Sequence, residues 1–105
     1  MKTITVEELR ERLSSGSPLQ IIDVREAYER DICCLNSEHI PLGDLLNQLH
    51  KLRKDIPVVL HCKGGDRAKA AVAALYQNHE FDNVYNLEGG IMAWAERIDP
   101  LMEKY

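Results

Sequence analysis

Three short, largely apolar runs lie along the chain, at Gln20–Val24, Val58–His61 and Val84–Leu87. Runs of this length are too short to be buried helices, and they are typical of strands whose two faces are both covered. The pattern therefore predicts three buried strands, the second of which begins directly after Pro57.

Other apolar residues recur at helical spacing. A capping box at Thr5–Glu8, with leucines four apart behind it, predicts a helix over Val6–Ser15 that stops at Gly16. The same spacing predicts three more helices: one with a leucine face at Leu45, Leu46, Leu49 and Leu52, one from Asp66 or Arg67 to about Asn78, and one over Ile91–Arg97, ended by Pro100.

Predicted strands and helices alternate along the sequence, and no repeat or linker interrupts them. This alternation predicts a single α/β domain over residues 1–105, with a mainly parallel central sheet flanked by helices. Ligands of such sheets bind beyond the carboxyl ends of the strands. The segments at these ends, Asp23–Arg25, Cys62 and Glu88–Gly90, are therefore expected to converge on one face.

The second predicted strand leads to Cys62, followed by a loop with Gly64 and Gly65 and by Arg67 at the start of a helix. Backbone N–H groups and the positive helix terminus then point at the sulfur, which favours a thiolate. Gly65 can adopt a positive φ that turns its N–H inward. Four residues separate the cysteine from the arginine, one fewer than in the cysteine phosphatases. The shorter loop is too tight for a phosphate but suits one sulfur atom carried on Cys62.

Composition narrows the function further. With 105 residues, 45% of them hydrophobic and 29% charged, the chain can form one soluble globular core. A net charge of −4 argues against nucleic acid and anionic membranes as partners. No apolar run reaches transmembrane length and the N-terminus lacks a signal peptide, so the predicted compartment is the cytoplasm. Three cysteines without a repeated metal-ligand spacing predict neither a disulfide framework nor a metal site, and they leave the role of Cys33 and Cys34 open.

Several segments together resemble the rhodaneses, sulfurtransferases that work through a cysteine persulfide. They are the loop from Cys62 to Arg67, Ile21–Glu26 with Tyr28 and Glu29, Ile40–Leu42, and Asn83–Trp94. The residues from Ile98 to Tyr105 look most like the rhodanese domains fused to enzymes that adenylate ubiquitin-like sulfur carriers. The resemblance extends over nearly the whole chain and implies a three-layer rhodanese-like domain.

The resemblance also implies roles for single residues. Cys62 matches the catalytic nucleophile, and the sulfur-binding loop matches Lys63, Gly64, Gly65, Asp66 and Arg67. Arg67 is expected to close the loop and to place positive charge beside the sulfur. Asp66 would oppose an anionic donor if its carboxylate faced the pocket, which makes a protein persulfide more attractive than thiosulfate.

A second set of residues is expected to support the loop. Asp23 and Arg25 resemble residues that brace it, with Glu29 as an ion-pair partner for Arg25. Gly89 and Gly90 fit a need for close backbone approach beside the loop. A histidine at the end of a strand is more often packed and hydrogen-bonded than a general base, and His61 is expected to be such a residue.

The resulting hypothesis is two-step sulfur transfer through a Cys62 persulfide, with no metal or organic cofactor. The donor is a small sulfur compound such as thiosulfate or a protein persulfide. By resemblance, the acceptor is a thiol or a ubiquitin-like sulfur carrier, and an adenylating enzyme is a candidate partner. Two hypotheses of other classes stay open: a small cysteine phosphatase or arsenate reductase, and a non-catalytic rhodanese-like interaction module. The sequence leaves the donor, the acceptor and the oligomeric state undetermined.

Overall fold

The computed structural model describes residues 2–105, and within this range the strands form one parallel sheet in the order β1-β5-β4-β2-β3. The strands are β1 (Thr3–Ile4), β2 (Gln20–Asp23), β3 (Glu38–His39), β4 (Val58–His61) and β5 (Val84–Leu87). The predicted α/β fold is confirmed, and the three strands predicted from the apolar runs are the central ones. The two edge strands, β1 and β3, have two residues each.

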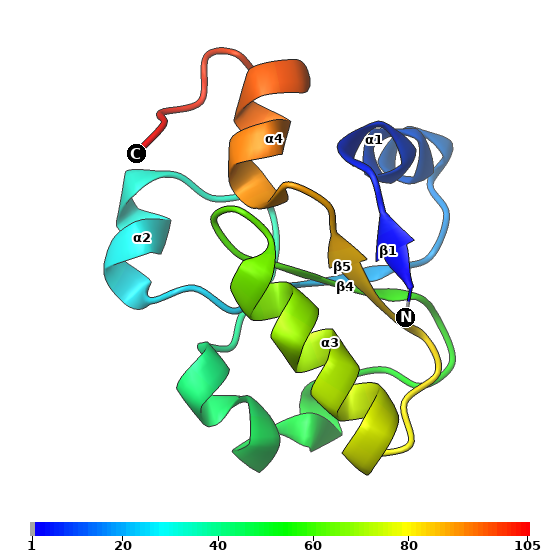
Figure 1. Ribbon diagram of the computed structural model, residues 1–105. Helices are drawn as coiled ribbons and strands as arrows, with labels where there is room; N and C mark the ends of the chain where they lie inside the picture. The colour runs from blue at the N-terminus through cyan, green and yellow to red at the C-terminus, as the bar shows by residue number, and fades with distance from the viewer. Residues whose placement is uncertain (1) are drawn as a thin grey trace.

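Helices cover both faces of the sheet (Figure 1). They are α1 (Val6–Ser15), α2 (Ala27–Ile32), α3 (Asp66–Asn78) and α4 (Gly90–Arg97). Successive strand residues point to opposite faces, so Ile21 packs with α1 and α4 while Ile22 packs with α3. The sheet is therefore the middle of three layers. No helix among residues 2–105 combines the length and the hydropathy needed to cross a bilayer.

The first helix begins and ends where the sequence predicts. The Thr5 hydroxyl accepts a hydrogen bond from the Glu8 N–H, and the Glu8 carboxylate accepts one from the Thr5 N–H, both at 3.1 Å. Gly16 then adopts the left-handed conformation, with φ of 72°, that ends the helix. The capping box and the glycine stop are both confirmed.

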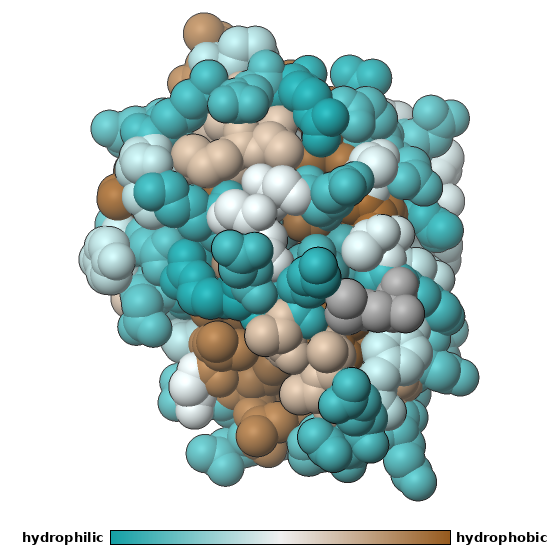
Figure 2. Space-filling model, in the orientation of Figure 1, coloured by the Kyte–Doolittle hydropathy of each residue, from teal (hydrophilic) through white to brown (hydrophobic). Residues whose placement is uncertain are grey.

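The segment with the four leucines does not form the predicted α-helix. It folds as two 3₁₀ helices, η1 (Leu42–Asn47) and η2 (Leu49–Lys51), separated at Gln48, where φ is −129°. Weak helix formers, Gly43 and Asn47, interrupt the leucines. Leu45 is buried, but Leu46 is 59% exposed. Figure 2 shows a hydrophobic area low on the molecule, over this part of the chain, on a face that is otherwise largely hydrophilic.

Candidate active site

The carboxyl ends of the central strands bring the predicted site segments together. Asp23 and His61 are register partners on β2 and β4, and the Val24 N–H donates to the His61 carbonyl at 3.0 Å. Cys62 follows β4 directly, so its sulfur lies at the point where both strands end. Gly89 and Gly90 follow β5 and contact the same loop. The expected convergence on one end of the sheet is thus present in the structure.

The thiol of Cys62 is surrounded by backbone N–H groups. Its Sγ accepts hydrogen bonds from the Gly65 N–H at 3.1 Å and from the Ala68 N–H at 3.5 Å. Gly65 has a φ of 108°, which turns its N–H toward the sulfur as the sequence predicts. Ala68 lies in the first turn of α3, whose N-terminal end therefore faces the thiol. Cys62 as a whole residue is 1% exposed.

The first turn of α4 fixes the loop from the other side. The Ile91 N–H donates to the Cys62 carbonyl at 2.9 Å, and the Met92 N–H donates to the Lys63 carbonyl at 3.1 Å. These two carbonyls point at α4. A Cβ atom at Gly90, which has a φ of 60°, would lie 2.7 Å from the Cys62 carbonyl oxygen and even closer to that of Lys63. The close backbone approach predicted for the glycine pair is present, and it occurs at Gly90.

A fully buried ion pair lies beside the loop. Arg25 donates to Asp23 through Nε at 3.0 Å and through Nη2 at 2.9 Å, and both side chains are 0% exposed. Burial alone raises the pKa of Asp23, but the hydrogen bonds from Arg25 outweigh it and hold the pKa below its usual value. Arg25 Nη2 also donates to the Cys33 carbonyl at 2.6 Å. The pair therefore ties the end of β2 to the residue that follows α2.

The predicted ion pair between Glu29 and Arg25 is wrong. Arg25 reaches only the backbone carbonyl of Glu29, at 3.3 Å, because Asp23 already neutralises its guanidinium. The Glu29 carboxylate instead accepts two hydrogen bonds from Arg67, at 2.7 and 2.8 Å. This bidentate pair lowers the pKa of Glu29 to about 2. Arg67 is thus held by α2 through this pair, and its role in closing the loop and placing positive charge beside the sulfur stays a prediction.

His61 is packed, as expected, but it is not hydrogen-bonded. It is 0% exposed, and neither ring nitrogen has a hydrogen-bond partner among residues 2–105. Its Nε2 lies 4.0 Å from the Asp23 carboxylate. Burial lowers the pKa of His61 to about 4, against the opposing attraction of Asp23. The imidazole is therefore neutral near pH 7 and fills space behind the loop.

The outer side of the loop carries the remaining predicted residues. Lys63 is half-buried, and its Nζ lies 4.4 Å from the centre of the Tyr105 ring. Gly64 and Asp66 are exposed.

Cys33 is buried and Cys34 is exposed, and both thiols are free. Among residues 2–105, no group of three His, Cys, Asp or Glu side chains could hold a metal ion.

Comparison with known proteins identifies the family of this chain. A family model described as Rhodanese-like domain matches residues 5–97. The chain belongs to the rhodanese-like domain family. The solved structure of a rhodanese-related protein from Thermoplasma volcanium is 30% identical, with a TM-score of 0.82, and the match covers 98% of this chain and 100% of that one.

Two longer proteins contain a similar rhodanese-like domain. The "Probable adenylyltransferase/sulfurtransferase MoeZ" of Mycobacterium tuberculosis is 41% identical over 98% of this chain, which spans only 27% of the length of that relative. The NAD-dependent persulfide reductase from A. fulgidus is 31% identical, with a TM-score of 0.67, over 90% of this chain and 16% of its own. The domain therefore occurs as a part of larger enzymes.

One residue of the site carries no sequence signal of its role. Tyr105 donates a hydrogen bond to Glu29 at 2.6 Å and accepts one from Arg25 at 3.0 Å. These partners precede it by 76 and 80 residues, so no local spacing connects them. The resemblance of the last residues to one group of rhodanese domains was the only feature that pointed to this segment.

Proposed function

We propose that this rhodanese-like domain is a sulfurtransferase whose nucleophile is Cys62. The observation that carries the proposal is the convergence of the Gly65 and Ala68 N–H groups on Sγ, at 3.1 and 3.5 Å. Such donors stabilise negative charge on sulfur, first on the thiolate and then on the outer sulfur of a persulfide. The guanidinium of Arg67, which is 36% exposed, adds positive charge to the same region.

The proposed reaction has two balanced steps. The Cys62 thiolate attacks the outer sulfur of a donor such as thiosulfate, a new S–S bond forms, and the donor's own S–S bond breaks to release sulfite. A nucleophilic acceptor thiolate then attacks the outer sulfur of the Cys62 persulfide. The acceptor leaves with that sulfur, and the Cys62 thiolate is regenerated. No net oxidation occurs, and no metal or organic cofactor enters either step.

A protein partner is the second part of the proposal. The name of the MoeZ relative joins adenylyltransferase and sulfurtransferase activities in one chain. By analogy, we propose that a sulfur carrier, or the enzyme that adenylates it, exchanges sulfur with Cys62, and that residues 1–105 act in this exchange as one domain. Three free thiols fit a reducing compartment, which supports the cytoplasm as the proposed location.

Intact-protein mass spectrometry tests the proposal. The protein is incubated with thiosulfate or with a persulfide donor, and we expect a gain of one sulfur atom that peptide mapping assigns to Cys62. Cys62→Ser should abolish both this gain and sulfur transfer to cyanide, while the matched control Cys34→Ser should retain both. Circular dichroism of each variant verifies that it is folded.

Two outcomes would contradict sulfur transfer and favour the alternatives. Hydrolysis of aryl phosphates through Cys62, without any gain of sulfur, would favour a cysteine phosphatase. The absence of both reactions, with a folded protein and several donors, would favour a non-catalytic interaction module.

A further inference from the structure

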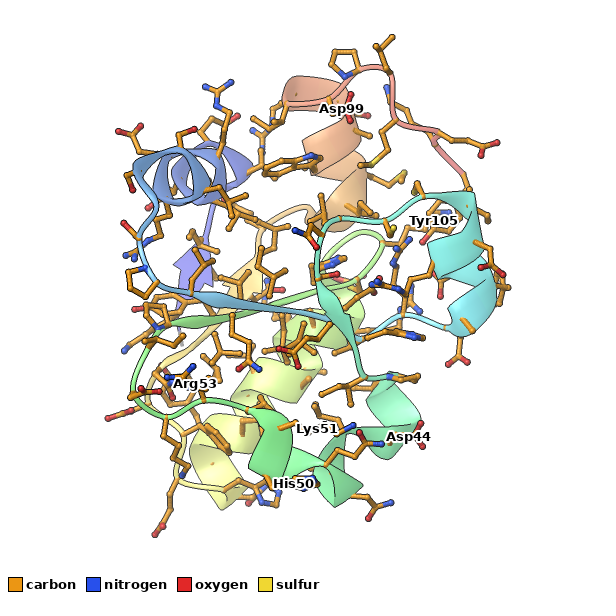
Figure 3. All side chains as sticks on the ribbon, turned by 180° about the vertical axis from the view of Figure 1, so that it is seen from behind. Asp44, His50, Lys51, Arg53, Asp99 and Tyr105 are labelled. Carbon is orange, nitrogen blue, oxygen red and sulfur yellow. The ribbon has the colours of Figure 1, made fainter. Side chains whose placement is uncertain are left out.

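Tyr105 lies far from the sulfur-binding loop in sequence but next to it in space. The chain after α4 turns back toward α2 (Figure 1), and Figure 3 shows Tyr105 beside that helix. Its hydroxyl donates to Glu29 Oε2 at 2.6 Å and accepts from Arg25 Nη1 at 3.0 Å. A single hydroxyl thus connects the buried pair of Asp23 and Arg25 to the pair of Glu29 and Arg67.

Tyr105 completes the set of donors around the Glu29 carboxylate. One oxygen, Oε1, accepts from Arg67 and from the Glu26 N–H, and the other, Oε2, accepts from Arg67 and from Tyr105. Four donors fix both the position and the rotation of a carboxylate that is 3% exposed. Without the tyrosine hydroxyl, only the partly exposed guanidinium of Arg67 would remain on Oε2. Glu29, and to a smaller extent the charge of Cys62, raises the pKa of Arg67, so the guanidinium lies within electrostatic reach of the thiol. Its position there therefore depends on Tyr105.

The ring of Tyr105 fixes a second cation at the loop. Lys63 Nζ lies 4.4 Å from the ring centre, and the guanidinium carbon of Arg25 lies 5.8 Å from it. Burial raises the pKa of Tyr105 to about 12, so the hydroxyl keeps its proton and remains a donor to Glu29 near pH 7. The hydroxyl and the ring thus act on different cations, Arg67 and Lys63.

Side chains rather than backbone anchor the segment that carries Tyr105. Leu101 is 96% exposed, whereas Met102 and Tyr105 pack against the core on the side of α1 and α4. Residues 103–105 belong to no helix or strand. The contacts of the tyrosine side chain are therefore what bring this segment to the loop.

We propose that Tyr105 is a positioning residue for sulfur transfer, which holds the Arg67 guanidinium and the Lys63 ammonium beside Cys62 and thereby favours negatively charged sulfur donors. The inference deepens the proposed function and rests on it for the identity of the reaction. The charge selectivity of Cys62 can nevertheless be measured without sulfur transfer.

Alkylation of Cys62 by iodoacetate and by iodoacetamide separates charge from access, because the two reagents differ mainly in charge. Rates are measured at the Cys62 peptide by mass spectrometry. We expect Tyr105→Phe, which keeps the ring, to lower the iodoacetate-to-iodoacetamide rate ratio about threefold, and Tyr105→Leu to lower it further. For thiosulfate, kcat/KM should fall by a similar factor, mainly through KM. Added salt should reduce the difference between wild type and variants.

Tyr85→Phe is the matched control. Tyr85 is also half-buried and also has a lysine near its ring, with Lys2 Nζ 5.3 Å from the ring centre, but it lies on β5. In Tyr85→Phe, the iodoacetate-to-iodoacetamide rate ratio at Cys62 should equal that of the wild type. An unchanged ratio in both Tyr105 variants, or an equal fall with both reagents, would overturn the inference. A lowered ratio in a protein that transfers no sulfur would support the positioning role and contradict the proposed function.

Discussion

At the amino ends of β2 and β4, the buried side-chain amide of Gln20 connects three chain segments. It donates hydrogen bonds to the Glu38 carboxylate at 3.0 Å and to the Lys51 carbonyl at 2.8 Å, and it accepts one from the Arg53 N–H at 2.8 Å. At the carboxyl ends of the same strands, the N–H groups of Gly65 and Ala68 point at a thiol. Figure 3 shows Arg53 and Tyr105 on opposite sides of the molecule. Within residues 2–105, polar groups connect chain segments at both ends of the sheet, but only at the carboxyl ends do two backbone donors also converge on one sulfur atom.

A pocket at the amino ends of β2 and β4 shows the same contrast between the two ends of the sheet. It has a volume of about 580 Å³ and is lined by Ser17, Gln20, Arg53 and Ile56, among others. Both N–H groups of the Gln20 amide and its oxygen have partners, and Arg53 pairs with Asp55 at 2.6 Å. The volume of a pocket is therefore a weaker indication of a reactive site than hydrogen-bond donors that point at one atom.

The largest expected effect comes from Gly90→Ala at the carboxyl ends. The new methyl group would meet the carbonyls of Cys62 and Lys63, and φ of 60° is unfavourable for alanine. We expect a loss of about 2–4 kcal/mol in the free energy of unfolding and at least about a tenfold fall in sulfur transfer. Urea unfolding and steady-state kinetics measure the two effects.

Gly64→Ala is the control in the same loop. A Cβ atom there would have no neighbour within 4 Å, and Gly64 does not have a positive φ. Stability and activity should remain near those of the wild type. Equal losses of stability and activity in Gly90→Ala and Gly64→Ala would show that the loop is not held by its contact with α4.

The second prediction concerns the pH dependence of stability. The folded pKa of His61 is about 4, below its usual value of 6.5, so between these values the unfolded chain binds a proton that the folded protein does not. Stability should therefore decrease as the pH falls through this window, by about 1 kcal/mol per pH unit near its middle. The charged groups that act on the imidazole are Asp23, Arg25 and Arg30, and the lowered pKa of Asp23 keeps that carboxylate ionised over this range.

Urea unfolding at several pH values from 7 to 5 measures this slope. His61→Phe should flatten it, whereas His50→Gln, a change at an exposed histidine of η2, should leave it unchanged. The range stays above pH 4.5, below which protonation of Glu29 in the unfolded chain would add a second loss. A slope that is identical in His61→Phe and in the wild type would contradict the neutral, buried state of this imidazole.

The smallest expected change in stability comes from removing one of two bidentate ion pairs, one at each end of the sheet. Glu29→Gln removes the buried partner of Arg67 and should cost about 1 kcal/mol of stability, a value reduced by solvent because Arg67 is 36% exposed. Asp55→Asn removes a similar pair at the amino ends, where both side chains are more than half exposed to solvent, and should cost clearly less stability. Thermal unfolding ranks the two variants, and sulfur transfer should fall only in Glu29→Gln. A larger loss in Asp55→Asn would reverse the comparison.

Local features of the chain were predictable because they depend on neighbours in sequence. The capping box at Thr5, the left-handed Gly65 and the central strands each follow from a few adjacent residues. β1, β3 and α2 are too short to produce a periodic signal. The leucine segment shows that apolar spacing alone does not separate an α-helix from two 3₁₀ turns.

The electrostatics of the site were less predictable. Glu29 lies four residues from Arg25, a spacing that favours an ion pair on a helix, yet its partner is Arg67, 38 residues away. The choice follows from Asp23, whose position two residues before Arg25 lets it neutralise that arginine first. Competition between partners of this kind depends on the fold, and only the structure resolves it.

The contact between α4 and the loop also bears on how such domains diversify. The backbone of the loop is fixed by main-chain donors at Ile91 and Met92, which do not depend on the side chains of the loop itself. The exposed positions 64 and 66 can therefore be exchanged without rebuilding the frame around the sulfur. If Cys62 exchanges sulfur as proposed, libraries varied at these two positions would change which donors and acceptors dock there, and the same freedom would let one scaffold serve different partners.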